Sequence, residues 1–264
     1  MTAHSSAHAQ THAAVPRFFA PDAFAAHGTV TVGEDAARHM RVLRLGPGSS
    51  VFLLDGQGRR ATGTLRTLAK RSATVEVEEI DAIPAAPAVH ALVPIADRDR
   101  MLWLAEKAAE LELASWRPVM WKRSRSVTPK GEGHGFQGRV LARMTSALEQ
   151  SGNPWLPAMY PDATPERALA ALPPSRRLVL DVTGDSIIRA LARPGAAPLV
   201  IAVGPEGGFE ESEISLLADA GFERVSLGSM TLRFETAGIA ALAHARAALA
   251  SPLAAALATT EKAE

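Results

Sequence analysis

The chain has 264 residues, of which 47% are hydrophobic, and its 28 basic side chains are balanced by 28 acidic ones. This length suits one large domain or two small ones, and the apolar fraction allows a substantial core. The sequence has no cysteine, which excludes disulfides, thiolate metal sites and cysteine nucleophiles. No run reaches the ~20 apolar residues of a membrane-spanning helix. Residues 1–14 have no basic start and no apolar centre and are not expected to be a secretory signal, so we expect a cytoplasmic protein.

The charges are unevenly distributed along the chain. Residues 38–71 carry 8 basic and 1 acidic side chain, residues 117–143 carry 7 and 1, and residues 144–264 carry 9 and 14. Such segregation suits a protein whose front part meets phosphates. The alternative is two solvated basic surfaces with no polyanionic partner.

The first part of the chain reads as a tail followed by a small β-rich domain. Residues 1–14 are polar and contain His4, His8 and His12, for which a disordered tail is favoured over a metal site. Residues 15–82 predict the β-rich domain, and a proline-rich linker over 83–88 ends it. Its expected elements are a helix over 36–44, strands over 51–55, 61–68 and 73–80, and a tight turn over 55–58.

After the linker the pattern changes to alternating strands and helices. This alternation predicts a parallel sheet covered on both faces, within a second domain over 89–252. Residues 253–264 are expected to be frayed. The expected strands are 89–93, 118–121, 177–181, 199–203 and a short one at 225–227, and the expected helices are 100–113, 139–150, 165–172, 187–192, 210–220 and 235–249.

A glycine-rich loop at residues 204–208 is the most informative segment. The apolar strand 199–203 stops at Gly-Pro-Glu-Gly-Gly, and a helical pattern follows. Such strand–loop–helix edges are where α/β proteins bind small ligands, and glycine lets a ligand lie against the backbone. The loop is neither G-x-G-x-x-G nor a P-loop, so we do not expect a pyrophosphate to hold the ligand. An ordinary tight turn is the alternative.

A second glycine-broken strand end follows at Leu227-Gly228, before a long helix of small residues. Two such strand ends can meet at one edge of a parallel sheet and form two walls of one pocket. A buried C-terminal helix after an ordinary turn is the alternative.

The two loops, with the segment Leu-Arg-Phe-Glu-Thr-Ala at 232–237, resemble the RsmE family of ribosomal RNA methyltransferases. The resemblance covers about residues 15–250 and is specific in its order and spacing. The sequence departs from the family at Asp97, Glu112, Asn153 and Phe234, where the family usually has a basic residue, Gly, Arg and Thr. Further matching segments are 17–19, 39–45 with Gly48, 55–56, 99–101, 106–111, 123–127 and 148–152.

The resemblance implies a SPOUT-superfamily enzyme with two domains. These are an N-terminal PUA-like small β-barrel that binds RNA, and a C-terminal α/β domain with a trefoil knot, in a homodimer. The implied cofactor is S-adenosyl-L-methionine, and the implied reaction is methylation of N3 of a specific uridine in 16S rRNA of the small ribosomal subunit. No metal is needed, because the sulfonium itself makes the methyl group electrophilic. The alternatives are a SPOUT ribose 2′-O-methyltransferase of tRNA or rRNA, and a non-catalytic RNA-binding ribosome assembly factor.

The resemblance also implies site residues. Arg233 is a candidate to neutralise a phosphate or the developing anion of the acceptor, with a surface ion pair as the alternative. Glu206 is a candidate base, but a role in fixing the loop by accepting hydrogen bonds from backbone N–H groups is favoured. Glu235 lies near a helix start, where its negative charge suits the helix dipole. No general base is identified. The expected cofactor-binding residues are Leu180, Val182, Gly204, Pro205, Glu206, Gly207, Gly208, Leu227, Gly228 and Leu232.

Basic residues outside the loops are the candidates for RNA contacts. Phe18 and Phe19 are candidates to stack on a splayed base, although a role in the core is favoured. Reversing Arg123 and Arg125 is expected to weaken RNA binding and leave cofactor affinity unchanged. The expected phosphate contacts are Arg17, Arg38, Arg41, Arg44, Lys122, Arg123, Arg125, Lys130, Arg139 and Arg143.

Overall fold

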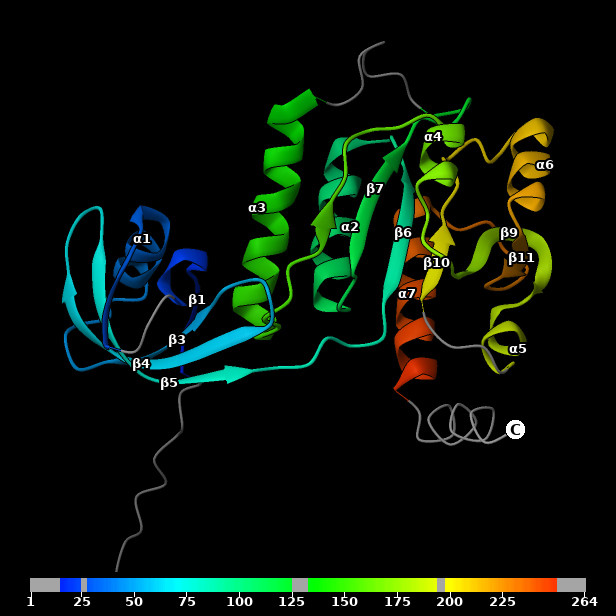
Figure 1. The fold of residues 1–264 in the computed structure, drawn as a ribbon. Helices are drawn as coiled ribbons and strands as arrows, with labels where there is room; N and C mark the ends of the chain where they lie inside the picture. The colour runs from blue at the N-terminus through cyan, green and yellow to red at the C-terminus, as the bar shows by residue number, and fades with distance from the viewer. Residues whose placement is uncertain (1–14, 25–27, 125–132, 194–197, 251–264) are drawn as a thin grey trace, which may run out of the picture. The chain divides into compact units, whose positions relative to one another are not determined.

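The computed structural model describes residues 15–24, 28–124, 133–193 and 198–250 (Figure 1). The chain divides into two compact units, one of residues 1–55 with 59–81 and one of residues 56–58 with 82–264. No helix of the described ranges is long and apolar enough to cross a bilayer. The predicted tails, and with them His4, His8 and His12, lie outside the described residues.

The first unit is a mixed five-stranded sheet in the order β1-β3-β4-β5-β2. β1 pairs with β3 in parallel, whereas β2 with β5 and β3 with β4 are antiparallel. Its elements are β1 (Arg17–Phe19), the 3-10 helix η1 (Pro21–Phe24), β2 (Gly28–Val32), α1 (Glu34–Val42), β3 (Ser50–Leu54), β4 (Arg59–Leu68) and β5 (Ala73–Ala82).

The core of this unit follows from the alternation along its strands. Val75 and Val77 of β5 are buried, as expected for a strand with one face on the core. Phe18 is fully buried and meets the His39 ring edge-on at 5.3 Å. Phe18 therefore belongs to the core, the role that the sequence favoured. The sequence analysis missed β1 and β2, although β2 alternates threonine and valine.

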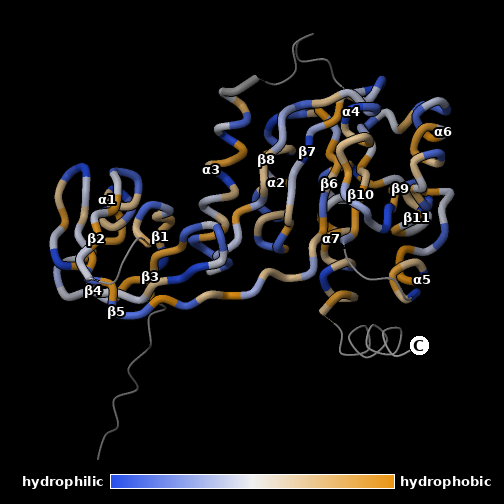
Figure 2. Tube along the Cα trace, viewed as in Figure 1, coloured by the Kyte–Doolittle hydropathy of each residue, from blue (hydrophilic) through white to orange (hydrophobic). Residues whose placement is uncertain are grey.

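The second unit is a six-stranded parallel sheet in the order β11-β9-β10-β6-β7-β8. Its strands are β6 (Val89–Pro94), β7 (Ser115–Val119), β8 (Ala158–Met159), β9 (Arg176–Ser186), β10 (Leu199–Ala202) and β11 (Phe222–Ser226). Its helices are α2 (Arg98–Glu110), α3 (Gly133–Ser151), α4 (Pro165–Ala170), α5 (Ile187–Leu191), α6 (Glu211–Asp219) and α7 (Phe234–Leu249). In Figure 2 apolar and polar stretches alternate along α3, which contacts α2.

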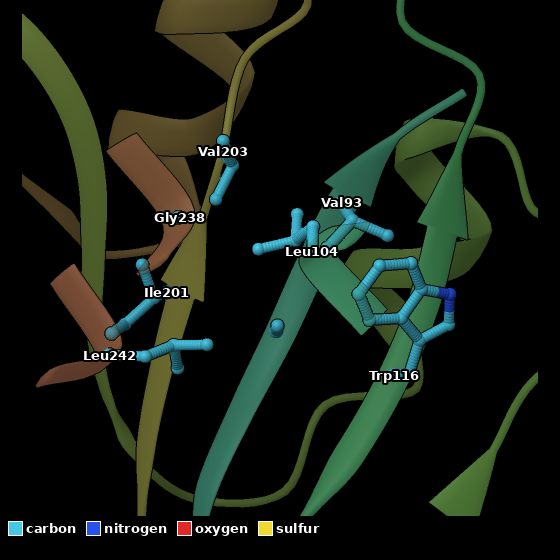
Figure 3. A pocket seen from close by; sticks show the side chains of 8 residues that line it. Val93, Leu104, Trp116, Ile201, Val203, Gly238 and Leu242 are labelled. Carbon is cyan, nitrogen blue, oxygen red and sulfur yellow. The ribbon is translucent and has the colours of Figure 1, made fainter. Parts of the chain in front are cut away.

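Helices cover both faces of this sheet, as predicted for alternating strands and helices. On one face, side chains of β6, β7 and β10 meet α2 and α7 around a cavity of only about 10 Å³ (Figure 3). A Cβ at Gly238 of α7 would lie 2.9 Å from Leu104 of α2, so glycine permits the close contact of these helices. On the other face, Leu92 and Val200 share a cluster with Ala168 of α4 and Leu217 of α6.

Several predicted bounds were wrong. β7 begins at Ser115 rather than at Pro118. The predicted start was wrong because proline is typical of a strand end, whereas here it lies inside the strand. The Pro118 carbonyl accepts from the Ala163 amide. Pro118 therefore turns the side that lacks an N–H toward the β8 side of the sheet, where the two-residue strand β8 has already ended and no strand needs that donor. α3 begins at Gly133 rather than 139, since packing on α2 outweighs the low helix propensity of its glycines. β9 extends to Ser186 instead of ending at 181, and β8 was not predicted.

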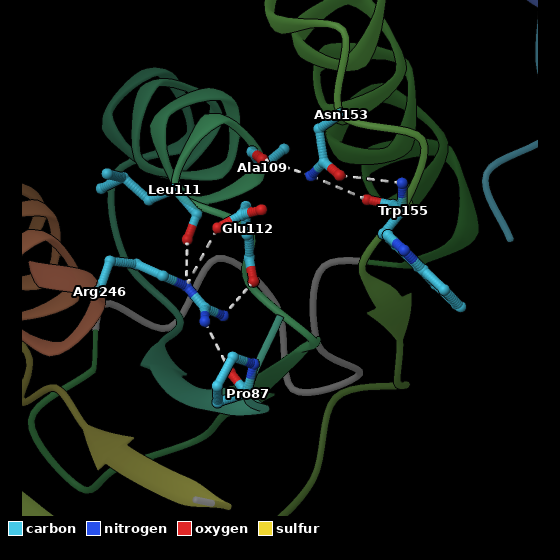
Figure 4. A network of polar contacts seen from close by, with 7 residues as sticks. All are labelled: Pro87, Ala109, Leu111, Glu112, Asn153, Trp155 and Arg246. Atoms are coloured by element: carbon cyan, nitrogen blue, oxygen red, sulfur yellow. Dashed lines mark hydrogen bonds and ion pairs between the residues drawn. The ribbon is translucent and has the colours of Figure 1, made fainter. Parts of the chain in front are cut away.

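Glu112, which replaces the family's usual glycine, has a left-handed backbone with φ 55°. Arg246 of α7 holds this turn: its guanidinium donates to the carbonyls of Leu111 (2.8 Å), Pro87 (2.6 Å) and Glu112 (Figure 4). Asn153, the second departure, donates to the carbonyl of Ala109 at 3.3 Å. Asn153 thus contacts the last turn of α2, and the Glu112 carboxylate in the following turn lies 4.0 Å from Nε of Arg246.

Candidate functional site

The parallel strands of the second unit all end at one edge of the sheet, which we call the carboxyl edge. The loop 204–208 follows β10 there, and the loop 227–233 follows β11. β11 is an edge strand of the sheet, and β9 and β10 separate it from β6. The next helix, α7, nevertheless contacts α2 and β6. The chain between β11 and α7 therefore runs along the carboxyl edge past the ends of β9 and β10. The trefoil knot that the resemblance implies stays a prediction.

The loop 204–208 is held by local contacts. The Gly208 amide donates to the Pro205 carbonyl at 2.8 Å. A Cβ at Gly204 would lie 2.8 Å from the Phe209 ring, which in turn meets the buried Trp121 ring edge-on at 4.9 Å. Glycine at 204 is therefore required for this aromatic contact, which turns the chain from β10 toward α6.

Residues that follow β7 contact the far end of the same loop and the first turn of α6. The Arg123 guanidinium donates to the Gly207 carbonyl at 2.9 Å, and the Lys122 ammonium donates to Ser212 at 2.9 Å. The Lys122 amide donates to the carboxylate of Glu213 at 2.6 Å, within the capping box of α6. Of the residues expected to bind RNA, Arg123 thus contacts the glycine loop and Lys122 contacts the first turn of α6. Because of the contact with Gly207, we expect reversal of Arg123 to disturb the loop and to weaken cofactor binding as well as RNA binding.

Arg100 of α2 links the two sides of the carboxyl edge. Its guanidinium forms an ion pair with Glu206, 106 residues away, and its Nε lies 3.7 Å from Glu235 at the start of α7. Glu235 is only 4% exposed, and its Oε2 has no hydrogen-bond partner among the described residues. The contact of Glu206 with Arg100 favours the loop-fixing role over the role of a base. Sequence reasoning gave Arg100 no role, because no spacing rule connects positions so far apart.

Apolar side chains of β9 and of the second loop are uncovered. Val182, Met230 and Leu232 are 51%, 74% and 39% exposed, and Leu180 is half-buried. Ser226 makes a tight turn with Gly228, from whose amide it accepts and to whose carbonyl it donates. Exposed apolar side chains gathered near one edge are typical of a surface that binds a ligand or partner.

Arg233 is exposed at the start of α7. The structure gives it no ion pair with any described residue, so the surface ion pair that was its alternative role is not observed there. Its role toward a phosphate or the anion of the acceptor stays a prediction.

The other candidate RNA contacts are distributed over both units. In the first unit, Arg38 forms an ion pair with Asp35 at 2.9 Å and Arg41 donates to the Ala69 carbonyl at 2.7 Å. Arg44 has a positive φ of 55°, and Arg17 lies on β1. These four residues stay predicted RNA contacts.

In the second unit, Arg143 lies 3.6 Å from Glu106, and Arg139 stacks on the ring of Phe136. Both side chains belong to α3. Arg125 and Lys130 lie outside the described residues. RNA binding by this group stays a prediction.

Comparison with known proteins gives two family models that match the chain. Residues 84–246 match an RNA methyltransferase domain, and residues 32–78 match an RNA methyltransferase PUA domain. The sequence is 30% identical over 218 residues to the ribosomal RNA small subunit methyltransferase E of Synechocystis, covering 80% of this chain and 70% of that protein. It is 28% identical to the protein of the same name from Rickettsia conorii, covering 78% and 83%.

Solved structures share the fold. A ribosomal RNA small subunit methyltransferase E from Neisseria gonorrhoeae, bound to S-adenosyl methionine, superposes with a TM-score of 0.77 at 30% identity, over 87% of this chain and 96% of that one. A methyltransferase from Legionella pneumophila superposes with a TM-score of 0.82 at 24% identity, over 89% and 98%. The PUA-like first unit and the parallel α/β second unit expected from sequence are thus confirmed, and the chain belongs to the RsmE family of RNA methyltransferases.

Proposed function

We propose that this protein is an S-adenosyl-L-methionine-dependent methyltransferase that acts on N3 of a uridine in 16S rRNA of the small ribosomal subunit. The observation that carries the proposal is the carboxyl edge, where Arg100 joins the loop 204–208 to the start of α7. Family membership supports the same reaction class.

The residues at this edge suit the cofactor. Gly208 leaves open space beside the backbone of the loop 204–208, since a Cβ there would meet nothing within 4 Å. The exposed Val182 and Leu232 offer apolar contact to an adenosine ring. The buried Oε2 of Glu235 lacks a hydrogen-bond donor in the described residues, as expected for an acceptor beside a ligand site. The proposed cofactor-binding residues are those expected from sequence, at 180, 182, 204–208, 227, 228 and 232.

When bound, the cofactor supplies an electrophilic methyl group. The protein has to align that methyl with the acceptor and exclude water. Uridine N3 lies on the Watson–Crick edge and carries a proton, so the base has to be unpaired or flipped and the proton has to leave. We infer that Arg233, which is exposed and has no ion pair with a described residue, stabilises the anion that forms on the base. Glu206, held by Arg100, positions the loop.

The candidate basic residues of the first unit and of α3 are proposed to bind rRNA phosphates, and the protein is proposed to act as a homodimer. A ribose 2′-O-methyltransferase is the second candidate, because it needs the same cofactor loops. It differs in the acceptor atom, which an experiment can identify.

The test incubates the purified protein with labelled S-adenosyl-L-methionine and small subunits that lack the modification. Mass spectrometry of the digested RNA then locates the methyl group. We expect methylation of a uridine base and, for Arg233→Met, a rate lower by about two orders of magnitude, as for the loss of a charge-stabilising donor. Arg167→Met, which changes an exposed arginine of α4, is the control and should keep full activity. A methyl group on ribose, or no incorporation, would overturn the proposal.

A further inference from the structure

A second hollow lies away from the carboxyl edge, at the amino ends of β6 and β7. It has a volume of about 450 Å³, within the range of pockets that bind small molecules. The strand register places His90 beside Ser115 and Leu92 beside Arg117, all on the face that α4 and α6 cover. The proposed methyl-transfer site does not include any of these residues.

An arginine without a carboxylate partner lines this hollow. The Arg117 guanidinium lies over the Tyr160 ring, with its Cζ 4.0 Å from the ring centroid. The described residues contribute no carboxylate within ion-pair distance of it, although Arg117 is half-buried. Stacking on an aromatic ring offsets only part of the cost of burying a cation. An anion that enters the hollow would supply the missing charge.

A polar pair and an apolar wall complete the lining. Nδ1 of His90 and Oγ of Ser115 are 2.7 Å apart. Burial lowers the pKa of His90, so near neutral pH the ring contributes hydrogen-bonding atoms rather than a second charge. The opposite wall is apolar and consists of Ala170, Ala171, Leu172, Pro173 and Pro198.

We propose that this hollow is a binding site for a small anionic molecule with a planar ring, of the class of nucleoside monophosphates. The single cation matches one phosphate group. The flat Arg117–Tyr160 stack and the apolar wall match a planar base, which an inorganic anion lacks. The volume accommodates both parts together.

Tyr160 is the only tyrosine in the chain, and this makes a direct test possible. Protein labelled with 3-fluorotyrosine gives a single ¹⁹F resonance, which reports on the hollow alone. The probe is cytidine 5′-monophosphate, because its base is neither that of the cofactor nor that of the proposed acceptor. Inorganic phosphate and cytidine are titrated separately, so that the contribution of each part is measured.

We expect a saturable shift of the Tyr160 resonance with cytidine monophosphate at concentrations up to about 10 mM, and a weaker response to either part alone. Arg117→Gln should weaken binding at least about tenfold, whereas Arg117→Lys, which keeps the charge, should retain part of it. Arg189→Gln, which changes an exposed arginine of α5, is the control and should bind as the unchanged protein does. Thermal unfolding of each variant verifies that it is folded.

Three outcomes would overturn the proposal. These are no shift at the highest concentration, equal binding by Arg117→Gln, and an inorganic phosphate response that matches the nucleotide. None of them bears on methyl transfer, so the two proposals fail independently.

Discussion

Replacement of Arg100 by methionine tests whether this residue holds the carboxyl edge together. The change removes the guanidinium and leaves the carboxylate of Glu235, which is only 4% exposed, without its cation. Breaking a fully buried pair costs about 3–5 kcal/mol and breaking an exposed one about 0–1 kcal/mol. The Arg100 side chain is 32% exposed and lies 3.7 Å from Glu235. We therefore expect the free energy of unfolding to fall by about 1.5 kcal/mol, between these limits.

Urea denaturation measures this loss, and a double-mutant cycle assigns it to the pair. Glu235→Gln removes the buried charge with little change in shape. In the Arg100→Met background it should recover at least half of the lost stability. The matched control is Arg143→Met, since Arg143 is 57% exposed and lies 3.6 Å from Glu106. Its loss should stay below about 0.5 kcal/mol.

The same variant should weaken cofactor binding, because Arg100 also holds Glu206 of the loop 204–208. Isothermal titration with S-adenosyl-L-methionine is expected to give a Kd about tenfold higher for Arg100→Met, and an unchanged Kd for Arg143→Met. The reasoning is refuted if the two arginine variants lose equal stability, or if Glu235→Gln in the Arg100→Met background lowers stability further.

Three further predictions follow from single residues. Glu112 has φ 55°, so Glu112→Gly should be about 1 kcal/mol more stable than Glu112→Ala in urea denaturation, and equal stabilities would contradict the strain. Burial lowers the pKa of His90 in the folded protein, so the unfolded chain binds more protons as the pH falls from about 7.5 to about 5.5. The free energy of unfolding should therefore decrease over this range, and His90→Asn should flatten the decrease. Gly204→Ala should lower the free energy of unfolding by about 1–2 kcal/mol and weaken cofactor binding, since its Cβ would lie 2.8 Å from the Phe209 ring. The control Gly138→Ala should be tolerated, because its Cβ would meet nothing within 4 Å.

Local patterns in the sequence predicted most of the second unit. The strands at 89–93 and 199–203 and the helix at 235–249 lie close to β6, β10 and α7, because continuous apolar runs and small-residue helical patterns are local signals. The β8 strand was missed because two residues are too few to show the alternation of apolar and polar side chains that indicates a strand. The longer β9 was missed because its end is paired only with β11.

The sequence by itself determined the class of the fold, the two glycine loops and the family, because each depends on residues close together in the chain. It also marked Glu112 as a departure from a usual glycine, and the left-handed backbone at this position explains the preference of the family for glycine. Only the tertiary structure decided what holds the first loop and joins it to the start of α7. Arg100 reaches Glu206 and Glu235, and Arg123 reaches Gly207, through contacts across large sequence separations. Such contacts depend on strand order and helix packing, and no local pattern encodes them.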